Sequence, residues 1–205
     1  MKKVLLILLV ILLAAGAYAW TRRDSLAGLL KMKRTAETPS AAENVLGQTA
    51  KNGKKILTVY FSWSGNTRRT AKKIHEAVGG DLFEIRPEKP YPSGYNETVD
   101  RAKKEKADSA RPAIAGTLPD MKNYDIVILG YPIWWYIEPM IIDTFAETAG
   151  LDGKIICPFA TSGGSTITES VKHLRGIAPK ADIRDGLLAN VESRIEPWLK
   201  ENGLM

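Results

Sequence analysis

Apolar and polar residues follow two alternating patterns from Lys55 to the end of the chain. Short apolar runs are typical of buried strands, whereas apolar residues that recur every three or four positions are typical of amphipathic helices. The apolar runs predict strands at residues 55–61, 81–86, 125–130 and 154–160, and a weaker strand at 181–188. The periodic stretches predict helices at residues 67–78, 94–107, 138–149, 166–175 and 191–201. Five strands that alternate with helices predict an α/β fold with a doubly wound parallel sheet.

The first 20 residues have a different pattern. Lys2 and Lys3 precede an apolar run at residues 4–20, which contains an A-x-A triplet at residues 17–19. The run has no polar face, which disfavours a helix of a soluble core. A charged start, an apolar stretch and a small-residue triplet are the parts of a secretory signal peptide, and the run is also nearly long enough to span a bilayer. We therefore expect residues 1–20 to be a signal peptide or a membrane anchor.

Residues 21–54 predict a basic membrane-proximal segment followed by a flexible linker. Lys and Arg residues cluster at 22–34, and residues 35–54 are rich in Ala, Thr, Ser, Asn and Gly without a sustained apolar period. The basic cluster favours a cytoplasmic domain, whereas the A-x-A triplet favours export. We expect a membrane-associated or secreted protein on the extracytoplasmic side, with a cytoplasmic-facing anchor as the alternative. The globular domain would occupy residues 55–205.

The net charge is concentrated in this N-terminal part. The chain has 205 residues and a formal net charge of +6, but nine of its 29 Lys and Arg residues and only three of its 23 acids lie in residues 1–54. The remaining 151 residues carry 20 of each and are neutral overall. A neutral domain without an aromatic-laced basic stripe is a poor binder of nucleic acid, so we expect no nucleic-acid partner.

Cysteine and histidine are too sparse for the usual metal and disulfide sites. The single cysteine, Cys157, excludes an intrachain disulfide and lies in an apolar strand, where it is expected to be buried. Neither His75 nor His173 has a carboxylate or cysteine partner at ligand spacing. Both are interpreted as ordinary histidines, and no metal site is expected.

The loop after the first predicted strand has the composition of an anion site. It contains Ser62, Trp63, Ser64, Gly65, Asn66 and Thr67 and leads directly into a helix. Hydroxyl side chains around a glycine at a helix N-terminus surround an anion with donors at the positive end of the helix dipole. The loop lacks both the Lys of a nucleoside triphosphate loop and the G-x-G-x-x-G of a dinucleotide loop. Ordinary helix capping by Ser64 or Asn66 remains the alternative, and Arg68 and Arg69 would face either the anion or solvent.

Two further loops follow the third and fourth strands. The first contains Pro132, Ile133, Trp134 and Trp135 between two tyrosines, Tyr131 and Tyr136, and four aromatic residues at a strand end favour stacking on a planar ligand over core packing. The second contains Thr161, Ser162, Gly163, Gly164 and Ser165, in which glycines permit close approach of a ligand and hydroxyls can bond to polar ring atoms. The carboxyl ends of parallel strands meet at one edge, so the three loops are expected to form one site.

The three loops together resemble those of the flavodoxin family over roughly residues 55–203. The matching segments are YFSWSGNT at 60–67, LGYPIWW at 129–135 and PFATSGGS at 158–165, and YPSGYNETVDRAKKE at 91–105 is similar to a bacterial subgroup of flavodoxin-like proteins. The resemblance implies a five-stranded sheet in the order 2-1-3-4-5 with helices on both faces, and flavin mononucleotide (FMN) as cofactor. It also implies that Ser62, Ser64, Asn66 and Thr67 hold the phosphate, that Pro132, Ile133 and Trp134 line the isoalloxazine ring, and that Gly163 and Gly164 border its edge.

Two departures from the family bear on function. Flavodoxins that carry electrons are usually strongly acidic, whereas this domain is neutral. The loop at residues 161–165 also lacks an aromatic residue, so one flavin face would be open unless Tyr91 or Tyr95 covers it. We expect a redox protein that transfers electrons through non-covalent FMN, either to a protein partner or as a reductase for NAD(P)H and a quinone or other small molecule. A membrane-tethered binding module without flavin is the alternative of a different class.

Overall fold

Six parallel strands form one sheet in the part of the chain that the structure, a computed structural model, describes, residues 49–205. The strands are β1 (Ile56–Tyr60), β2 (Asp81–Glu84), β3 (Ile126–Pro132), β4 (Ile155–Thr161), β5 (Asp182–Ile183) and β6 (Leu187–Leu188). Their order is β2-β1-β3-β4-β5, and β6 also pairs with β4. The expected order is confirmed, and the chain reverses its direction across the sheet between β1 and β3.

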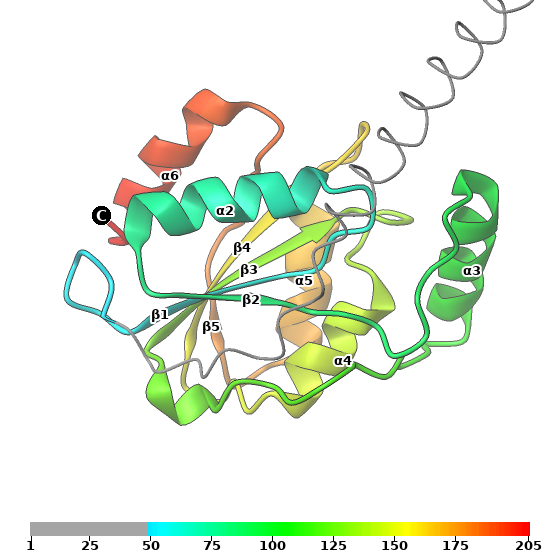
Figure 1. The fold of residues 1–205 in the computed structure, drawn as a ribbon, viewed down its shortest axis with the longest axis horizontal. Coiled ribbons are helices and arrows are strands. Elements are labelled where there is room, and N and C mark those ends of the chain that lie inside the picture. The colour runs from blue at the N-terminus through cyan, green and yellow to red at the C-terminus, as the bar shows by residue number, and fades with distance from the viewer. Residues whose placement is uncertain (1–48) are drawn as a thin grey trace, which may run out of the picture. The chain divides into compact units, whose positions relative to one another are not determined.

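Helices cover both faces of this sheet (Figure 1). They are α2 (Asn66–Val78), α3 (Tyr95–Ala107), α4 (Met140–Thr148), α5 (Thr168–Ile177) and α6 (Ile195–Glu201), with 3-10 turns at Met121–Asn123 and Glu192–Arg194. In Figure 1, α2 and α6 lie above the sheet and α4 and α5 below it, while α3 stands toward the end at which the strand arrows point. The loops that leave the carboxyl ends of β1, β3 and β4 therefore lie between α2 and α3.

Alternation along the strands divides the core into two layers. On β1, Leu57 and Val59 pack into the cluster that includes Phe145 of α4, whereas Ile56 and Tyr60 pack into the cluster that includes Ile74 of α2. Successive side chains of a strand point to opposite faces, so a strand covered on both sides is apolar throughout. This is why the apolar runs were sufficient to predict the central strands.

Gly130 on β3 is required by the packing of the second layer. A Cβ atom at this position would lie 2.1 Å from Cζ of Phe159, a distance at which the two atoms overlap. The ring of Phe159 thus covers the backbone of β3 at the last residues before the aromatic segment begins. The glycine allows β3 and β4 to stay in register up to the edge that carries the site.

The structure corrects the predicted C-terminal third. The single strand predicted at 181–188 is two short strands separated by Arg184, Asp185 and Gly186. Both pair with β4, but β5 pairs near its start and β6 near its end. The last helix begins at Ile195 instead of residue 191, after a 3-10 turn. Polar and apolar periodicity does not distinguish a 3-10 turn from the first turn of a helix, which explains this shift.

Ordered contacts begin before Lys55, the predicted start of the domain. Thr49 forms an antiparallel bridge with Lys55, Ala50 forms one with Gly79, and the Lys51 N–H donates to the Val78 carbonyl (2.9 Å). The predicted signal or anchor at 1–20 and most of the segment at 21–54 lie outside the described residues. Between residues 49 and 205, no helix combines the length and the apolar character needed to cross a bilayer.

The interpretation of His173 as a histidine without a carboxylate partner is wrong. Its Nδ1 lies 2.7 Å from Oε1 of Glu138 and 3.8 Å from Oδ1 of Asp143. The partners are 35 and 30 positions away in the sequence and come together because α4 and α5 pack side by side. Cys157 is fully buried as expected, and burial raises the pKa of its thiol to about 12.

Candidate functional site

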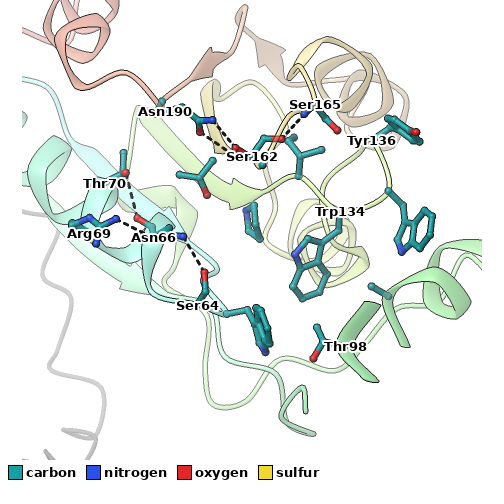
Figure 2. A pocket seen from close by; sticks show the side chains of 18 of the residues that line it. Ser64, Asn66, Arg69, Thr70, Thr98, Trp134, Tyr136, Ser162, Ser165 and Asn190 are labelled. Carbon is teal, nitrogen blue, oxygen red and sulfur yellow. Dashed lines mark hydrogen bonds between the residues drawn. The ribbon is translucent and has the colours of Figure 1, made fainter. Parts of the chain in front are cut away.

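Three loops form one pocket at the carboxyl ends of the strands (Figure 2). We call residues 62–67 the hydroxyl loop, residues 134–137 the aromatic turn and residues 161–165 the glycine loop. The cavity has a volume of about 850 Å³ and extends from the N-terminal part of α2 to α3. Eleven of the fifteen site residues predicted from the sequence line it: Trp63, Ser64, Asn66, Pro132, Ile133, Trp134, Trp135, Thr161, Ser162, Gly163 and Ser165.

Four predicted residues do not line the pocket, and three of them shape its loops instead. Ser62 Oγ accepts a hydrogen bond from the N–H of Gly65 (3.1 Å), which closes the hydroxyl loop. Thr67 is buried, and its hydroxyl lies 2.9 Å from that of Thr161, which ties the start of α2 to β4. Gly164 donates its N–H to Ser162 Oγ (3.1 Å) within the glycine loop. The assignment of Ser62 and Thr67 to direct phosphate contact remains a prediction that their positions do not favour.

The N-terminus of α2 is open toward the pocket. Gly65 precedes the helix with φ of 87°, a left-handed conformation that glycine adopts without the strain of a Cβ atom. Within the described chain, no side chain caps this helix and no acidic residue lies in its first turn. The alternative of ordinary capping by Ser64 or Asn66 is therefore wrong. The first-turn N–H groups and the positive end of the helix dipole remain available for an anion.

The side chains around this helix start add polar groups to the pocket wall. Ser64 and Asn66 are both exposed, and the Asn66 amide donates to Ser64 Oγ (3.3 Å) while its Oδ1 accepts from Arg69 (2.8 Å). Arg69 lines the pocket, whereas Arg68 turns away and forms an ion pair with Glu84. The hydrogen bond to Glu84 raises the pKa of Arg68. Arg69 is thus the arginine of this pair that can contribute positive charge to an anion in the pocket.

Trp134 forms the aromatic wall of the pocket, and two rings behind it hold its orientation. Phe61 and Tyr91 pack against Trp134 edge to face, with ring centroids at 5.5 Å and 5.0 Å. The Tyr91 hydroxyl donates to Glu105 (2.7 Å), and burial together with Glu105 raises its pKa, so the hydroxyl stays protonated. Tyr91 therefore supports Trp134 from behind, and the idea that it covers an open cofactor face is wrong. Tyr95, the other residue considered for that role, lines the pocket and is 70% exposed.

The aromatic turn has an unusual backbone. Trp135 and Tyr136 have φ of 51° and 75°, and the Trp134 N–H donates to the Ile137 carbonyl (2.8 Å). Two central residues with positive φ are the mark of a type I′ turn, which normally contains asparagine and glycine. Bulky residues in this conformation are strained by about 1–3 kcal/mol each. The turn is held by α3, because Trp135 Nε1 donates to Val99 O (3.1 Å) and Lys106 Nζ donates to Trp135 O (2.5 Å).

The four aromatic residues around this segment do not act as one cluster. Tyr131 is fully buried, and its hydroxyl lies 2.9 Å from Ser170 Oγ, so it belongs to the core. Trp134, Trp135 and Tyr136 line the pocket, as ligand stacking requires. The direction of each side chain depends on the local turn, which the composition of the segment does not specify.

The glycine loop is fixed by a residue that the sequence did not indicate. Asn190, which follows β6, accepts from the N–H of Ser162 (3.0 Å) and donates to its carbonyl (2.5 Å). Ser162 Oγ in turn accepts from the N–H groups of Gly164 and Ser165. Asn190 is 28 positions from Ser162, and the pairing of β6 with β4 places the two residues together.

Sequence reasoning also missed the side of the pocket that α3 forms. The additional lining residues are Arg69, Thr70 and Lys73 from α2, Tyr95, Thr98, Val99 and Ala102 from α3, Tyr136 from the aromatic turn, and Ala189, Asn190, Glu192 and Ile195 near the C-terminus. The resemblance of residues 91–105 to a bacterial subgroup was the available signal for α3, and of the two tyrosines considered there as covers of the flavin face, only Tyr95 lines the pocket. The pocket can thus accept an anion at α2, a flat ring at Trp134 and a further group toward α3.

Comparisons with known proteins agree with this geometry. A flavodoxin family model matches residues 55–202. A candidate flavoprotein from Bacteroides eggerthii has 44% sequence identity and a TM-score of 0.67, with 72% of this chain and 97% of that chain covered. A second one, from Bacteroides uniformis, has 38% identity and a TM-score of 0.67, with 72% and 98% covered. A Lactobacillus acidophilus flavoprotein in complex with FMN has 25% identity and a TM-score of 0.62, with 71% and 98% covered.

No curated protein matches the chain. The family model alone spans more than half of the sequence, and the sheet order and the position of the pocket agree with it. This chain therefore belongs to the flavodoxin family.

Proposed function

We propose that the domain transfers electrons through one non-covalently bound FMN held in this pocket. The observation that carries the proposal is the open N-terminus of α2 at one end of a cavity whose wall is Trp134. A phosphate fits the first site and an isoalloxazine ring the second. The FMN-bound Lactobacillus acidophilus flavoprotein supports the same cofactor for this chain. Bound FMN supplies one-electron and two-electron redox chemistry, for which the protein provides binding and orientation.

Different residues of the pocket would bind the phosphate and the ring of FMN. The first-turn N–H groups of α2, Ser64, Asn66 and Arg69 would hold the phosphate. Pro132, Ile133 and Trp134 would contact the ring, and the glycine loop would provide donors for its polar edge. Trp134 cannot tilt freely, because Phe61 and Tyr91 pack against it. Because Trp134 is already held in place, binding of the isoalloxazine ring would not carry the entropic cost of ordering this side chain.

The binding step is tested by titration of the full-length protein, purified in mild detergent, with FMN. Stacking on Trp134 should quench flavin fluorescence and give saturation at one FMN per chain. A protein that is folded by circular dichroism but neither quenches nor retains FMN would contradict the proposal. That result would support the alternative of a membrane-tethered module that binds no flavin.

A reductase that uses NAD(P)H and a quinone or other small molecule is a second candidate, and the shape of the pocket favours it. The cavity continues past Trp134 to Thr98, Val99 and Ala102 of α3, and Tyr91 is not among the residues that line it. Steady-state oxidation of NADPH or NADH by the FMN-loaded protein with a quinone acceptor would separate the candidates. Turnover supports the reductase, whereas reduction only by a partner reductase supports the electron carrier.

Positive charge at the pocket rim indicates the nature of the reaction partner. Arg69 lines the pocket, and Lys103 and Lys106 lie near the rings of Trp135 and Tyr136 (5.4 Å and 6.0 Å). Lys73 also lines the pocket, but its charge is paired with that of Glu192 (2.6 Å). The domain is neutral overall, so this local field favours an anionic partner, whether a protein surface or a charged small molecule. Its reaction rate with the FMN-loaded protein should fall as ionic strength rises. A rate independent of salt would exclude such steering.

The N-terminal sequence supports attachment of this domain to a membrane. The apolar run at 4–20 and the basic residues at 22–34 are the features on which this part of the proposal rests. Protease treatment of intact cells would determine the side, because an extracytoplasmic domain is cleaved and a cytoplasmic one is protected. A chain found entirely in the soluble cytoplasmic fraction would contradict the attachment.

A further inference from the structure

Three potential metal ligands, none of which lines the pocket, meet on the face of the sheet that α4 and α5 cover. Glu138 lies just after the aromatic turn, Asp143 on α4 and His173 on α5. One ligand atom from each lies within 4.8 Å of the other two. Glu138 and Asp143 are 1% and 0% exposed, whereas the His173 side chain is 36% exposed. The cluster is thus buried on its acidic side and open on its imidazole side.

Asp143 is the unusual member of this cluster. Among the described residues, neither of its carboxylate oxygens receives a hydrogen bond, although both are buried. Glu138 has partners in Ser170 and His173, whereas Asp143 has no donor, and a buried carboxylate without a donor is costly. Asp143 is therefore the member of the cluster whose oxygens remain available to a further ligand.

Arg111 is the nearest fixed positive charge, but its position does not satisfy Asp143. Its NH1 lies 3.6 Å from Asp143 Oδ2, too far for a hydrogen bond. Its guanidinium N–H groups donate instead to Glu147 (2.7 Å and 2.8 Å) and to the carbonyls of Ser109 and Ala110. Arg111 thus pairs with Glu147 at the surface of α4 and donates no hydrogen bond to Asp143.

We propose that Glu138, Asp143 and His173 bind one divalent transition-metal ion, with Zn²⁺ as the best match. One imidazole nitrogen and two carboxylate oxygens are ligands that Zn²⁺ accepts in tetrahedral sites, with a fourth position left for water. Ligand atoms around such an ion lie about 3.3 Å apart. The His173 Nδ1 distances of 2.7 Å to Glu138 and 3.8 Å to Asp143 bracket this value, and the three ligand atoms all lie within 4.8 Å of one another.

Ser170 orients one of these ligands. Its hydroxyl donates to Glu138 Oε2 (2.5 Å) and is fully buried, which leaves Oε1 of Glu138 directed at His173. Outer hydrogen bonds of this kind fix the direction of a ligand carboxylate and strengthen binding. The two carboxylates neutralise the charge of a divalent ion, so binding removes the repulsion between them.

An ion at this place would connect the pocket to the helices below it. Glu138 directly follows the strained aromatic turn, whereas Asp143 and His173 belong to α4 and α5. A bond from each to one ion would fix the end of the turn on the helix pair. The proposed role is structural, and it does not depend on whether the pocket holds FMN.

Calorimetric titration of the metal-free, full-length protein with ZnCl₂ tests the site. We expect one equivalent of Zn²⁺ per chain and a rise in thermal stability on binding. Asp143→Asn and His173→Gln should each weaken binding by more than about 100-fold, because each removes a ligand. His75→Gln is the matched control, since it removes the other histidine, which lies on α2, and should leave binding unchanged.

An anomalous difference map of zinc-soaked crystals of the wild-type protein provides a second measurement that does not depend on the folding of any variant. A peak between the three side chains supports the proposal. No stoichiometric binding, no peak, or equal affinity of the wild type and Asp143→Asn would overturn it. Competition by Mg²⁺ at equal concentration would also overturn it, because Mg²⁺ prefers all-oxygen sites and gains little from His173.

Discussion

The hydroxyl loop and the aromatic turn lie on opposite sides of one pocket but are built on different principles. The hydroxyl loop presents backbone N–H groups, and the conformation that exposes them uses a glycine at φ of 87°. The aromatic turn presents rings, and it places Trp135 and Tyr136 in conformations that their side chains disfavour. The first loop is therefore relaxed and the second is strained.

This difference predicts where each side of the pocket is vulnerable. Substitution of one polar side chain in the hydroxyl loop leaves the N–H groups and the helix dipole in place. In the aromatic turn, the side chains are the binding surface, and contacts to Phe61, Tyr91 and α3 hold them against strain. Ligand binding should therefore tolerate the loss of one side chain in the hydroxyl loop, whereas it should not tolerate the loss of a ring in the aromatic turn.

Trp134→Ala should have the largest effect. It removes the pocket wall and leaves a cavity beside Phe61 and Tyr91, which we expect to lower the free energy of unfolding by about 2–4 kcal/mol. Loss of the stacking surface should weaken FMN binding roughly 10-fold to 100-fold, as an aromatic stack contributes about 1–3 kcal/mol. Urea unfolding and flavin fluorescence titration measure the two effects. Trp134→Phe, which retains a ring, should recover most of the affinity, and equal loss in both variants would place the role of Trp134 in packing alone.

Gly65→Ala should have the next largest effect and act through the backbone. No atom lies within 4 Å of the added Cβ, so the cost is that of a non-glycine residue at positive φ, about 1–2 kcal/mol. FMN affinity should fall as the N–H groups at the start of α2 move. Gly53→Ala is a matched control, with φ of 78° and open space around its Cβ but no contact with the pocket. It should lower stability similarly and leave FMN affinity unchanged, and a parallel loss of affinity would contradict the role of Gly65.

The parts of the structure that the sequence predicted well are those with one dominant local signal. The predicted strand at 125–130 is continuously apolar from Ile126 to Leu129, which is typical of a strand covered on both faces, and β3 is buried from Ile126 to Tyr131. The three loops were located because parallel strands bring their carboxyl ends to one edge. Both inferences follow from backbone geometry that does not depend on distant residues.

The parts that could not be predicted depend on contacts between distant segments. Asn190 reaches Ser162 across 28 positions, and Glu138 reaches His173 across 35. The orientation of Tyr91 behind Trp134 follows from its bond to Glu105 and its packing on Phe61, and neither is encoded in local spacing. Polar pairing of this kind is fixed only when the helices and strands have packed together.

Tyr136→Gly should have a smaller effect of the opposite sign. Tyr136 is 66% exposed and has φ of 75°, so glycine relieves backbone strain while little packing is lost. We expect a gain of about 0.5–1 kcal/mol after the greater freedom of the unfolded chain is included, measured as a rise in Tm of a few degrees. Tyr95→Gly, at an exposed aromatic residue in the first turn of α3, should bring no such gain. A lower Tm for Tyr136→Gly would show that the tyrosine ring, and not strain, dominates this position.

Ser64→Ala should have the smallest effect, although Ser64 belongs to the loop that the resemblance assigns to the phosphate. Its hydroxyl is exposed and accepts one long hydrogen bond from Asn66 (3.3 Å), so stability should change by less than about 0.5 kcal/mol. FMN affinity should fall only several-fold, because one hydrogen bond contributes about 1 kcal/mol while the N–H groups of α2 remain. Ser62→Ala is the informative partner variant, since Ser62 Oγ accepts from the Gly65 N–H and its loss should destabilise the fold by about 0.5–1.5 kcal/mol. If Ser64→Ala instead weakened FMN binding as much as Trp134→Ala, the hydroxyl loop would hold its ligand through side chains, and the contrast between the two sides of the pocket would fail.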